Sequence, residues 1–172
     1  MGTPEGSTGD IFEPCGRLRM DLFDPAAIQV LKESLRLARD TRWDSVRSPH
    51  VFMGLLAVPD CNIRNWGERL GADLPKLLGQ FQELFHQDEG ETGLPLAPHR
   101  EFLSDNVIRL LRDAYQRAVD HGRPRVTSMD LLICLLTAPQ SIVAECFERI
   151  GVTAAKLTEI AVIAEQYGGA GE

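Results

Sequence analysis

The feature that most constrains the fold of this chain is an internal repeat with a spacing of 80 residues (126 − 46). The stretch SVRSPHVFMGLLAVPD at 45–60 and the stretch RVTSMDLLICLLTAPQ at 125–140 carry Val, Ser, Leu-Leu and Pro in one register. The matched pairs are Val46 with Val126, Ser48 with Ser128, Leu55-Leu56 with Leu135-Leu136, and Pro59 with Pro139. Similarity at a fixed offset indicates tandem structural units that bury their apolar surface on each other.

The same register extends over four predicted helices in each half of the chain. It predicts a first repeat at 22–85 and a second at 104–167, joined by a linker with acids, Gly and Pro at 86–103. Residues 1–21 are rich in Gly, Pro, Ser and Thr and predict a mobile tail, and 168–172 predict a short C-terminal tail. We therefore expect an all-α fold in which two four-helix repeats pack as one globular domain about a pseudo-twofold axis.

Capping residues, prolines and glycines predict where the helices begin and end. Asp24 before Pro25 is typical of a helix start, and Ser48 before Pro49 predicts the start of the second helix. Gly71 predicts the end of the third helix. Further caps and stops are predicted at Asp73, Gly122, Thr127 or Ser128, Gly151 and Thr153, with fraying of the last helix at Gly168-Gly169. The second helix of each repeat is apolar on nearly all sides, which predicts a buried centre.

The charge of the chain restricts the classes of partner. Eighteen Lys and Arg against 25 Asp and Glu give a formal net charge of −7. Nucleic acids and anionic membranes attract basic surfaces, so neither is an expected partner. No apolar run approaches the roughly 18 residues that a transmembrane helix needs. We expect a cytoplasmic protein.

No combination of residues predicts catalysis or metal binding. The chain has neither a G-x-x-x-x-G-K-[ST] loop nor His, Cys and carboxylate groups at metal-ligand spacing. Its four cysteines are widely spaced and are interpreted as free thiols in a helical chain: Cys15, Cys61, Cys134 and Cys146. We expect a protein that is not an enzyme and needs no cofactor or metal.

The doubled unit resembles a known family. The segments RSPHVFMGLLAV and RLGADLPKLL in the first half, and TSMDLLICLLTA and RIGVTAAKLTEI in the second, are similar to the repeated motifs of the N-terminal domain of the Clp ATPases, the ClpA/ClpC/ClpB group of AAA+ unfoldases. The resemblance covers about 22–166. Because the chain lacks the nucleotide-binding motifs of that motor, it is either a free-standing protein or a fragment. The unusual N-terminal stretch and the YGGAGE end have the character of real termini.

In the ClpC branch, the resemblance implies a receptor for adaptors and for proteins marked by phosphoarginine. The glutamate that grips the modified arginine corresponds here to Pro49 and Met129. Neither side chain can form a bidentate contact with a guanidinium, so we expect phosphoarginine binding to be lost or much weakened. The neighbouring hydroxyls of Ser48 and Ser128 are interpreted as helix caps.

Apolar residues just outside the repeats are the first candidates for ligand contact. Met20, Leu22 and Phe23 precede the first repeat helix, and Leu103 precedes the first helix of the second repeat. In the family, their equivalents flank a groove that accepts peptides and certain cyclic-peptide antibiotics. The alternative is that Phe23 forms a hydrophobic staple onto Ile28.

Two tryptophans and a pair of unlike residues complete the candidates. Trp43 and Trp66 are expected to be partly exposed, and Trp43 lies on a predicted loop suited to ligand contact. His50 is interpreted as a buried structural histidine. Its repeat equivalent is Asp130, an acid favoured in the first turn of a helix, so the two repeats are not expected to bind equivalently.

The resemblance leads to two hypotheses. The first is a non-catalytic protein- or peptide-binding module of the Clp chaperone-protease system, which binds Clp ATPase or protease components, adaptors or client peptides. The alternative is a decoy that sequesters peptides or cyclic-peptide antibiotics that otherwise bind the N-domain of the motor.

Overall fold

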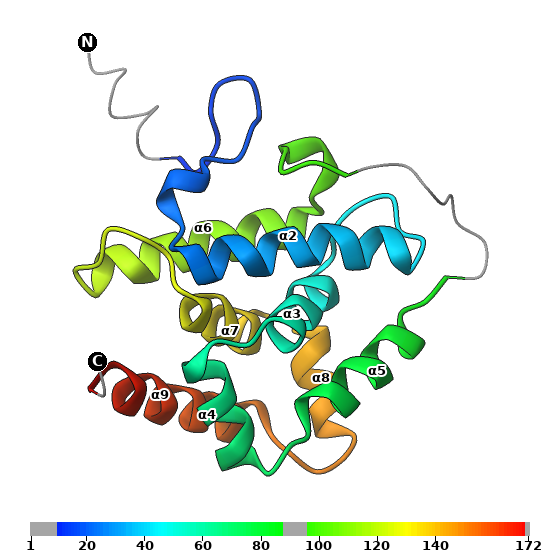
Figure 1. The fold of residues 1–172 in the computed structure, drawn as a ribbon, viewed down its shortest axis with the longest axis vertical. Coiled ribbons are helices and arrows are strands. Elements are labelled where there is room, and N and C mark those ends of the chain that lie inside the picture. The colour runs from blue at the N-terminus through cyan, green and yellow to red at the C-terminus, as the bar shows by residue number, and fades with distance from the viewer. Residues whose placement is uncertain (1–9, 88–95, 171–172) are drawn as a thin grey trace.

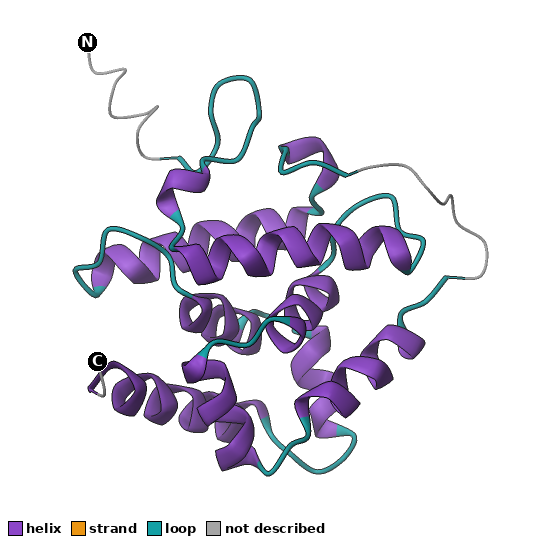
Figure 2. Cartoon of the chain, viewed as in Figure 1, coloured by secondary structure: helices purple, strands orange, loops and turns teal. Residues whose placement is uncertain are grey.

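The computed structural model describes residues 10–87 and 96–170, and these residues form an all-α fold (Figures 1 and 2). Its elements are η1 (Met20–Leu22), α2 (Pro25–Asp40), α3 (Ser48–Ala57), α4 (Cys61–Leu70), α5 (Leu74–Leu84), η2 (Arg100–Phe102), α6 (Asp105–Asp120), α7 (Ser128–Thr137), α8 (Ile142–Glu148) and α9 (Ala154–Ala170). Between described residues, extended pairing is limited to isolated bridges.

The elements repeat along the chain as the sequence predicts. The bounds of α2 and α6, of α3 and α7, and of η1 and η2 differ by 80 residues at both ends. The fourth helix of each repeat also starts 80 residues apart, but α9 runs further than α5, and α8 is shorter than α4. The described part therefore contains two four-helix units of one design, and their differences lie in the helices around α8.

Helices α3 and α7 form the buried centre. Figure 1 shows them between a layer made of α2 and α6 and a second layer made of α4, α5, α8 and α9. Their apolar side chains are almost wholly removed from solvent, from Val51 to Leu56 in α3 and from Leu131 to Leu136 in α7, Cys134 excepted. Each such side chain contributes roughly 1.5–3 kcal/mol of hydrophobic stabilisation, so these helices dominate the core.

Two reciprocal crossings join the repeats. Phe23 pairs with Val126, whose N–H donates to the Leu22 carbonyl at 2.7 Å. Leu103 pairs in the same way with Val46, whose N–H donates to the Phe102 carbonyl at 2.8 Å. The segment before the first helix of each repeat thus pairs with the other repeat. The two repeats are therefore related by an approximate twofold axis and share one core.

Trp66 differs from its predicted exposure. It is completely buried, and its indole N–H donates to the Leu157 carbonyl of α9 at 3.3 Å. Phe52, Phe81 and Phe147 lie close to it in a cluster of ring contacts between 4.9 and 6.4 Å. The reason is that α4 packs along α9. The face of α4 that carries Trp66 is therefore an interface between helices, which the sequence around Trp66 does not indicate.

Most predicted helix ends are confirmed. Asp24 accepts a hydrogen bond from the Ala27 N–H at 2.8 Å, and Gly71 ends α4 in the left-handed region with φ 78°. Ser48 is not the cap of α3: the helix already includes it, and Arg47 holds the cap position. At the end of α9, the helix continues through Gly168 and Gly169 to Ala170, so neither the predicted fraying nor a tail starting at 168 is found. Residues 171–172 lie outside the described residues.

The N-terminal segment also differs from the prediction. Residues 1–9 lie outside the described residues, but 10–21 are packed on the second repeat instead of forming a mobile tail. Ile11, Phe12 and Leu18 are at most 4% exposed. The segment is held by ion pairs of Asp10, which lies 3.1 Å from Arg112. Isolated apolar residues in a Gly- and Pro-rich stretch therefore mark a docked segment.

The second half of the predicted linker is ordered against that segment. The Leu18 N–H donates to the Pro98 carbonyl at 2.9 Å, and the Arg100 N–H donates to the Gly16 carbonyl at 2.8 Å. Residues 88–95 of the linker lie outside the described residues. Among the described helices, none is by itself long and apolar enough to cross a membrane; α7 and α8, bent by 70°, reach that length and composition only together.

Candidate functional site

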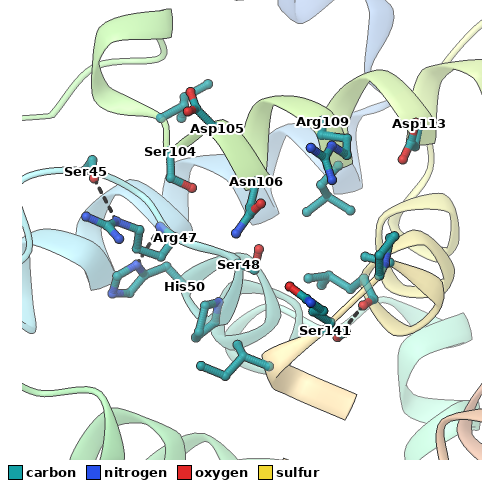
Figure 3. A pocket seen from close by; sticks show the side chains of 18 of the residues that line it. Ser45, Arg47, Ser48, His50, Ser104, Asp105, Asn106, Arg109, Asp113 and Ser141 are labelled. Atoms are coloured by element: carbon teal, nitrogen blue, oxygen red, sulfur yellow. Dashed lines mark hydrogen bonds between the residues drawn. The ribbon is translucent and has the colours of Figure 1, made fainter. Parts of the chain in front are cut away.

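A groove of about 740 Å³ lies where the two repeats meet, and we call it the α3–α6 groove (Figure 3). It is bounded by the starts of α3 and α6, the end of α5 and the turn between α7 and α8. Its lining includes Trp43, Ser45, Arg47, Ser48, Pro49, His50, Phe85, Leu103, Ser104, Asp105, Asn106, Arg109, Leu110, Asp113, Leu135, Ala138, Pro139, Gln140, Ser141 and Ile142. Both repeats contribute to it, so it exists only in the assembled domain.

The apolar part of the groove is built by prolines and aliphatic side chains. Pro49, in the first turn of α3, and Leu110 of α6 are buried, and Pro139 follows α7. Ile142 begins α8 and is 42% exposed at the edge of the groove. Apolar surface of this kind, next to a few polar groups, suits a peptide side chain or a small organic ligand.

Polar side chains without protein partners face this apolar part. Ser48, Asn106, Arg109 and Gln140 have no hydrogen bond or ion pair to any other described residue. Figure 3 shows the Ser48 hydroxyl and the Asn106 amide directed toward one another, with Arg109 further along α6. Between them, these four side chains offer hydroxyl, amide and guanidinium donors to a ligand.

The turn after α7 has an uncommon backbone. Gln140 lies in the left-handed region with φ 55°, where a residue other than glycine carries roughly 1–2 kcal/mol of strain. Next to it, the Ser141 hydroxyl donates to the Leu135 carbonyl at 2.7 Å and accepts from the Ala144 N–H at 3.2 Å, which caps α8. The strained turn places the Gln140 side chain on the groove.

An aromatic wall closes one end of the groove. The Trp43 indole N–H donates to the Phe85 carbonyl at 2.6 Å, and the Arg47 guanidinium lies over the Trp43 ring at 4.9 Å from its centroid. His50 meets the same ring edge-on at 5.6 Å. Trp43 is thus half-buried and lines the groove, and it lies on a loop, as predicted.

His50 is a buried structural histidine, as predicted. Its Nδ1 accepts a hydrogen bond from the Arg47 N–H at 2.9 Å, which assigns the proton to Nε2, 3.0 Å from the Thr41 hydroxyl. Burial, with the nearby Arg47 charge, lowers the pKa of His50 to about 4. It is therefore neutral at pH 7 and contributes structure to the aromatic wall.

The equivalent region of the other repeat, which we call the α2–α7 face, is closed. Here the Ser128 hydroxyl donates to the Asp60 carboxylate at 2.5 Å, across the repeat boundary. Met129, the equivalent of Pro49, is completely buried. Thr127, not Ser128, caps α7, so the interpretation of Ser128 as a cap is wrong.

Charged residues fill the space behind the α2–α7 face. Asp130, the equivalent of His50, is fully buried and binds Arg117 at 2.7 Å and Arg123 at 2.5 Å. Both arginines also lie near Glu165 of α9, at 2.9 and 3.7 Å. Burial opposes ionisation of Asp130, but hydrogen bonds from Arg123, the Thr127 N–H and Arg117 outweigh it and hold its pKa below the ordinary value.

The predicted contact residues do not all come together. Leu103 lines the α3–α6 groove with Trp43, whereas Met20 is half-buried elsewhere. Leu22 and Phe23 are buried, because the N-terminal segment covers that side and the main chain around them pairs with Val126.

Sequence reasoning missed the polar residues of the groove. Asn106 and Arg109 lie on α6 and Gln140 follows α7, and none stands in a recognised motif. The repeat alignment holds the signal, because it pairs Asn106 with Ala26 and Arg109 with Gln29. Positions at which the two repeats carry side chains of different polarity or charge therefore indicate where only one repeat can form a binding site.

Little in the described residues offers reactive chemistry. No three His, Cys, Asp or Glu side chains between residues 10–87 and 96–170 are placed to hold a metal ion. Burial raises the pKa of the Cys134 thiol to about 12, which keeps it protonated and weakly nucleophilic.

Comparisons with known proteins place the fold. No protein-family model and no curated protein matches the chain. Among solved structures, the N-terminal domain of the chaperone ClpD from Arabidopsis thaliana is 18% identical, with a TM-score of 0.66 over 88% of this chain and 99% of that one.

Two further solved structures agree with this result. The Hsp104 N-terminal domain from Candida albicans is 15% identical (TM-score 0.65, 81% of this chain and 89% of that one). The ClpV N-domain in complex with a VipB peptide is 18% identical (TM-score 0.62, 85% and 89%). The chain therefore has the fold of the Clp ATPase N-terminal domains, as its resemblance implied.

Proposed function

We propose that this chain is a non-catalytic protein-interaction module of the Clp chaperone-protease system, and that it binds peptide segments of partner proteins in the α3–α6 groove. The observation that carries the proposal is the groove itself, in which Ser48, Asn106, Arg109 and Gln140 lack partners among the described residues beside an apolar surface. The ClpV N-domain, which shares this fold, is known in complex with a peptide.

The chemistry of the groove supports a peptide ligand. A peptide backbone presents carbonyl acceptors at regular intervals, and the amides of Asn106 and Gln140 can donate to them. Pro49, Leu110 and Pro139 provide the adjoining surface for an apolar side chain. Ligand sites commonly combine an apolar surface with a few directed polar groups.

The proposed partners are Clp ATPase or protease components, adaptors or client proteins in the cytoplasm. Phosphoarginine receptors bind the modified guanidinium through a carboxylate, and this chain has Pro49 and Met129 at the two corresponding positions. We therefore do not propose phosphoarginine as a ligand. An adaptor or accessory role is consistent with a groove that binds the backbone and apolar side chains of a partner peptide.

Sequestration of cyclic peptides has less support. That hypothesis relies on Met20, Leu22, Phe23 and Leu103 flanking a common groove. Leu22 and Phe23 are buried, and only Leu103 of the four lines the α3–α6 groove. A cyclic peptide would therefore have to use a different set of contacts.

A pair of variants tests the proposal. Asn106→Trp fills the groove from an exposed helix position, and Gln80→Trp adds the same side chain at an exposed position of α5 outside the groove. Affinity purification from native lysate, read by quantitative mass spectrometry, should recover Clp components or their clients with the wild type and Gln80→Trp, but at least tenfold less with Asn106→Trp. Equal recovery by all three proteins would exclude the groove as the binding site.

A further inference from the structure

The two equivalent regions of the repeats carry opposite chemistry. In the α3–α6 groove, Arg47, Asn106 and Arg109 provide donors. Their equivalents at the α2–α7 face, 80 residues away in the alignment, are Thr127, Ala26 and Gln29, none of which is basic. Because the repeats are related by an approximate twofold axis, equivalent backbone positions can be compared directly. Positions 47 and 109 are arginines in the α3–α6 groove, whereas their equivalents at the α2–α7 face carry no basic side chain.

Acids occupy the α2–α7 face instead. Asp60 stands where the groove has Gln140, and Asp24 stands where it has Ser104. Burial raises the pKa of Asp24, and the charges of Asp60 and Asp130 raise it further, against the lowering effects of the Ala27 N–H and the Arg123 charge. Asp60 already binds Ser128, and the nearby Arg117 and Arg123 are already paired with carboxylates, so this face is less suited to an acidic ligand.

The guanidinium groups of Arg47 and Arg109 lack carboxylate partners among the described residues, as does that of Arg64 on α4, outside the groove. Arg36, Arg100, Arg112, Arg117 and Arg123 each lie within 4.0 Å of a carboxylate, from 2.5 Å to 3.9 Å. Across the described residues, Arg47 and Arg109 have no such neighbour; Arg47 donates to the Ser45 hydroxyl and stacks on Trp43.

Two acids of α6 also line the groove and must be considered. Asp105 and Asp113 lie four residues before and after Arg109, and neither forms an ion pair with it. Figure 3 shows Asp105 on the side of α6 that points away from Ser48, and Asp113 at the far end of the groove. The central part, around Ser48 and Asn106, therefore presents hydroxyl and amide donors.

We propose that the α3–α6 groove binds one acidic peptide segment per chain, with Asp or Glu side chains on Arg47 and Arg109 and an apolar residue on Pro49 and Leu110. This inference rests on the proposed function and names the ligand chemistry of the same groove. Arginine pairs with carboxylates through parallel hydrogen bonds, which gives the contact direction as well as charge. Because the arginines are exposed, their contribution should weaken as salt concentration rises.

Three synthetic peptides test the ligand chemistry. They share length, two leucines, an acetylated start and an amidated end, and they carry four glutamates, four glutamines or four lysines. Isothermal titration calorimetry at low salt should give about tenfold tighter binding of the glutamate peptide than of the glutamine peptide, one molecule per chain, and no binding of the lysine peptide.

Matched arginine variants locate the contact. Arg109→Gln and Arg47→Gln should each weaken the glutamate peptide by roughly threefold to tenfold and the glutamine peptide by less than about twofold. Arg64→Gln, an exposed arginine of α4 with no partner among the described residues, changes the net charge equally and should have no effect. An equal loss in all three variants would mean that only the overall charge matters, and would overturn the proposal.

The outcomes separate this inference from the proposed function. Equal affinity for all three peptides, abolished by Asn106→Trp, would overturn acidic selectivity and leave the peptide groove standing. Binding of none of them, together with equal lysate recovery by Asn106→Trp, would overturn both. If the amidated glutamate peptide does not bind and a fourth peptide, of the same sequence with a free C-terminal carboxylate, does, the proposal of side-chain recognition is wrong.

Discussion

His50 and Asp130 occupy equivalent positions in α3 and α7, and each contacts the residue seven positions before it. His50 meets the Trp43 ring at 5.6 Å, and Asp130 binds the Arg123 guanidinium at 2.5 Å. The pattern extends to two more equivalent pairs, Leu37 with Arg117 and Phe85 with Glu165. One backbone arrangement is thus filled by apolar and aromatic groups in the first repeat and by an ionic network in the second.

Removing the charge of Asp130 from the buried ionic network should lower the free energy of unfolding more than removing a charge from the protein surface. Asp130→Asn leaves two arginines around a buried neutral amide, and breaking a buried pair by removing one charge typically costs about 3–5 kcal/mol. We expect urea denaturation to show a loss of about 3 kcal/mol in the free energy of unfolding. Asp44→Asn, at an exposed loop position, is the control and should change it by less than about 0.5 kcal/mol.

The neutral His50 should make the domain less stable in acid. Its pKa is about 4 in the folded protein and about 6.5 in the unfolded chain, so the unfolded chain binds the proton first as pH falls. The stabilisation is complete above about pH 6.5 and is lost as pH falls toward 4, by about 2 kcal/mol at pH 5. Denaturation of the wild type and of His50→Gln between pH 7 and 5 measures this difference. The same slope in both proteins would contradict the assignment.

Much of the fold could be predicted because it depends on local signals that occur twice. The Asp24 cap, the Gly71 stop and the apolar helices α3 and α7 act within a few residues of themselves, so the sequence displays them directly. Trp66 is different, because its burial depends on α9, which lies 91 residues further along at Leu157.

The candidate site was less predictable for the same reason. Trp43 could be identified from its predicted loop and Leu103 from its position before the second repeat, but Asn106, Arg109 and Gln140 form a site only where α6 meets the turn after α7. A basic residue on a helix usually indicates a solvated surface. Only the position of Arg109 in the groove, three residues after Asn106 and without a carboxylate partner, indicates a ligand site.

The Asp60 carboxylate should stabilise the domain through two interactions, the hydrogen bond from Ser128 and the cap of α4. Asp60 also accepts from the Ile63 N–H at 2.9 Å and caps α4, so Asp60→Ala removes two interactions. We expect Asp60→Ala to cost about 2 kcal/mol and Ser128→Ala about 1 kcal/mol in the free energy of unfolding. Chemical denaturation of both variants provides the comparison. Equal losses would show that the cap has no separate effect.

Two glycines in helices should respond in opposite ways to alanine. At Gly54 in α3, an added Cβ would lie 2.6 Å from the Val30 carbonyl oxygen and 2.7 Å from the Ser34 hydroxyl, because α2 and α3 approach closely there. Gly54→Ala should therefore destabilise the domain by about 2 kcal/mol as the helices are forced apart. At Gly79 in α5, no atom lies within 4 Å of the added Cβ, so Gly79→Ala should stabilise by about 0.5–1 kcal/mol through helix propensity. Thermal unfolding of the two variants against the wild type tests both signs, and a gain in melting temperature for Gly54→Ala would contradict the close packing of α2 on α3.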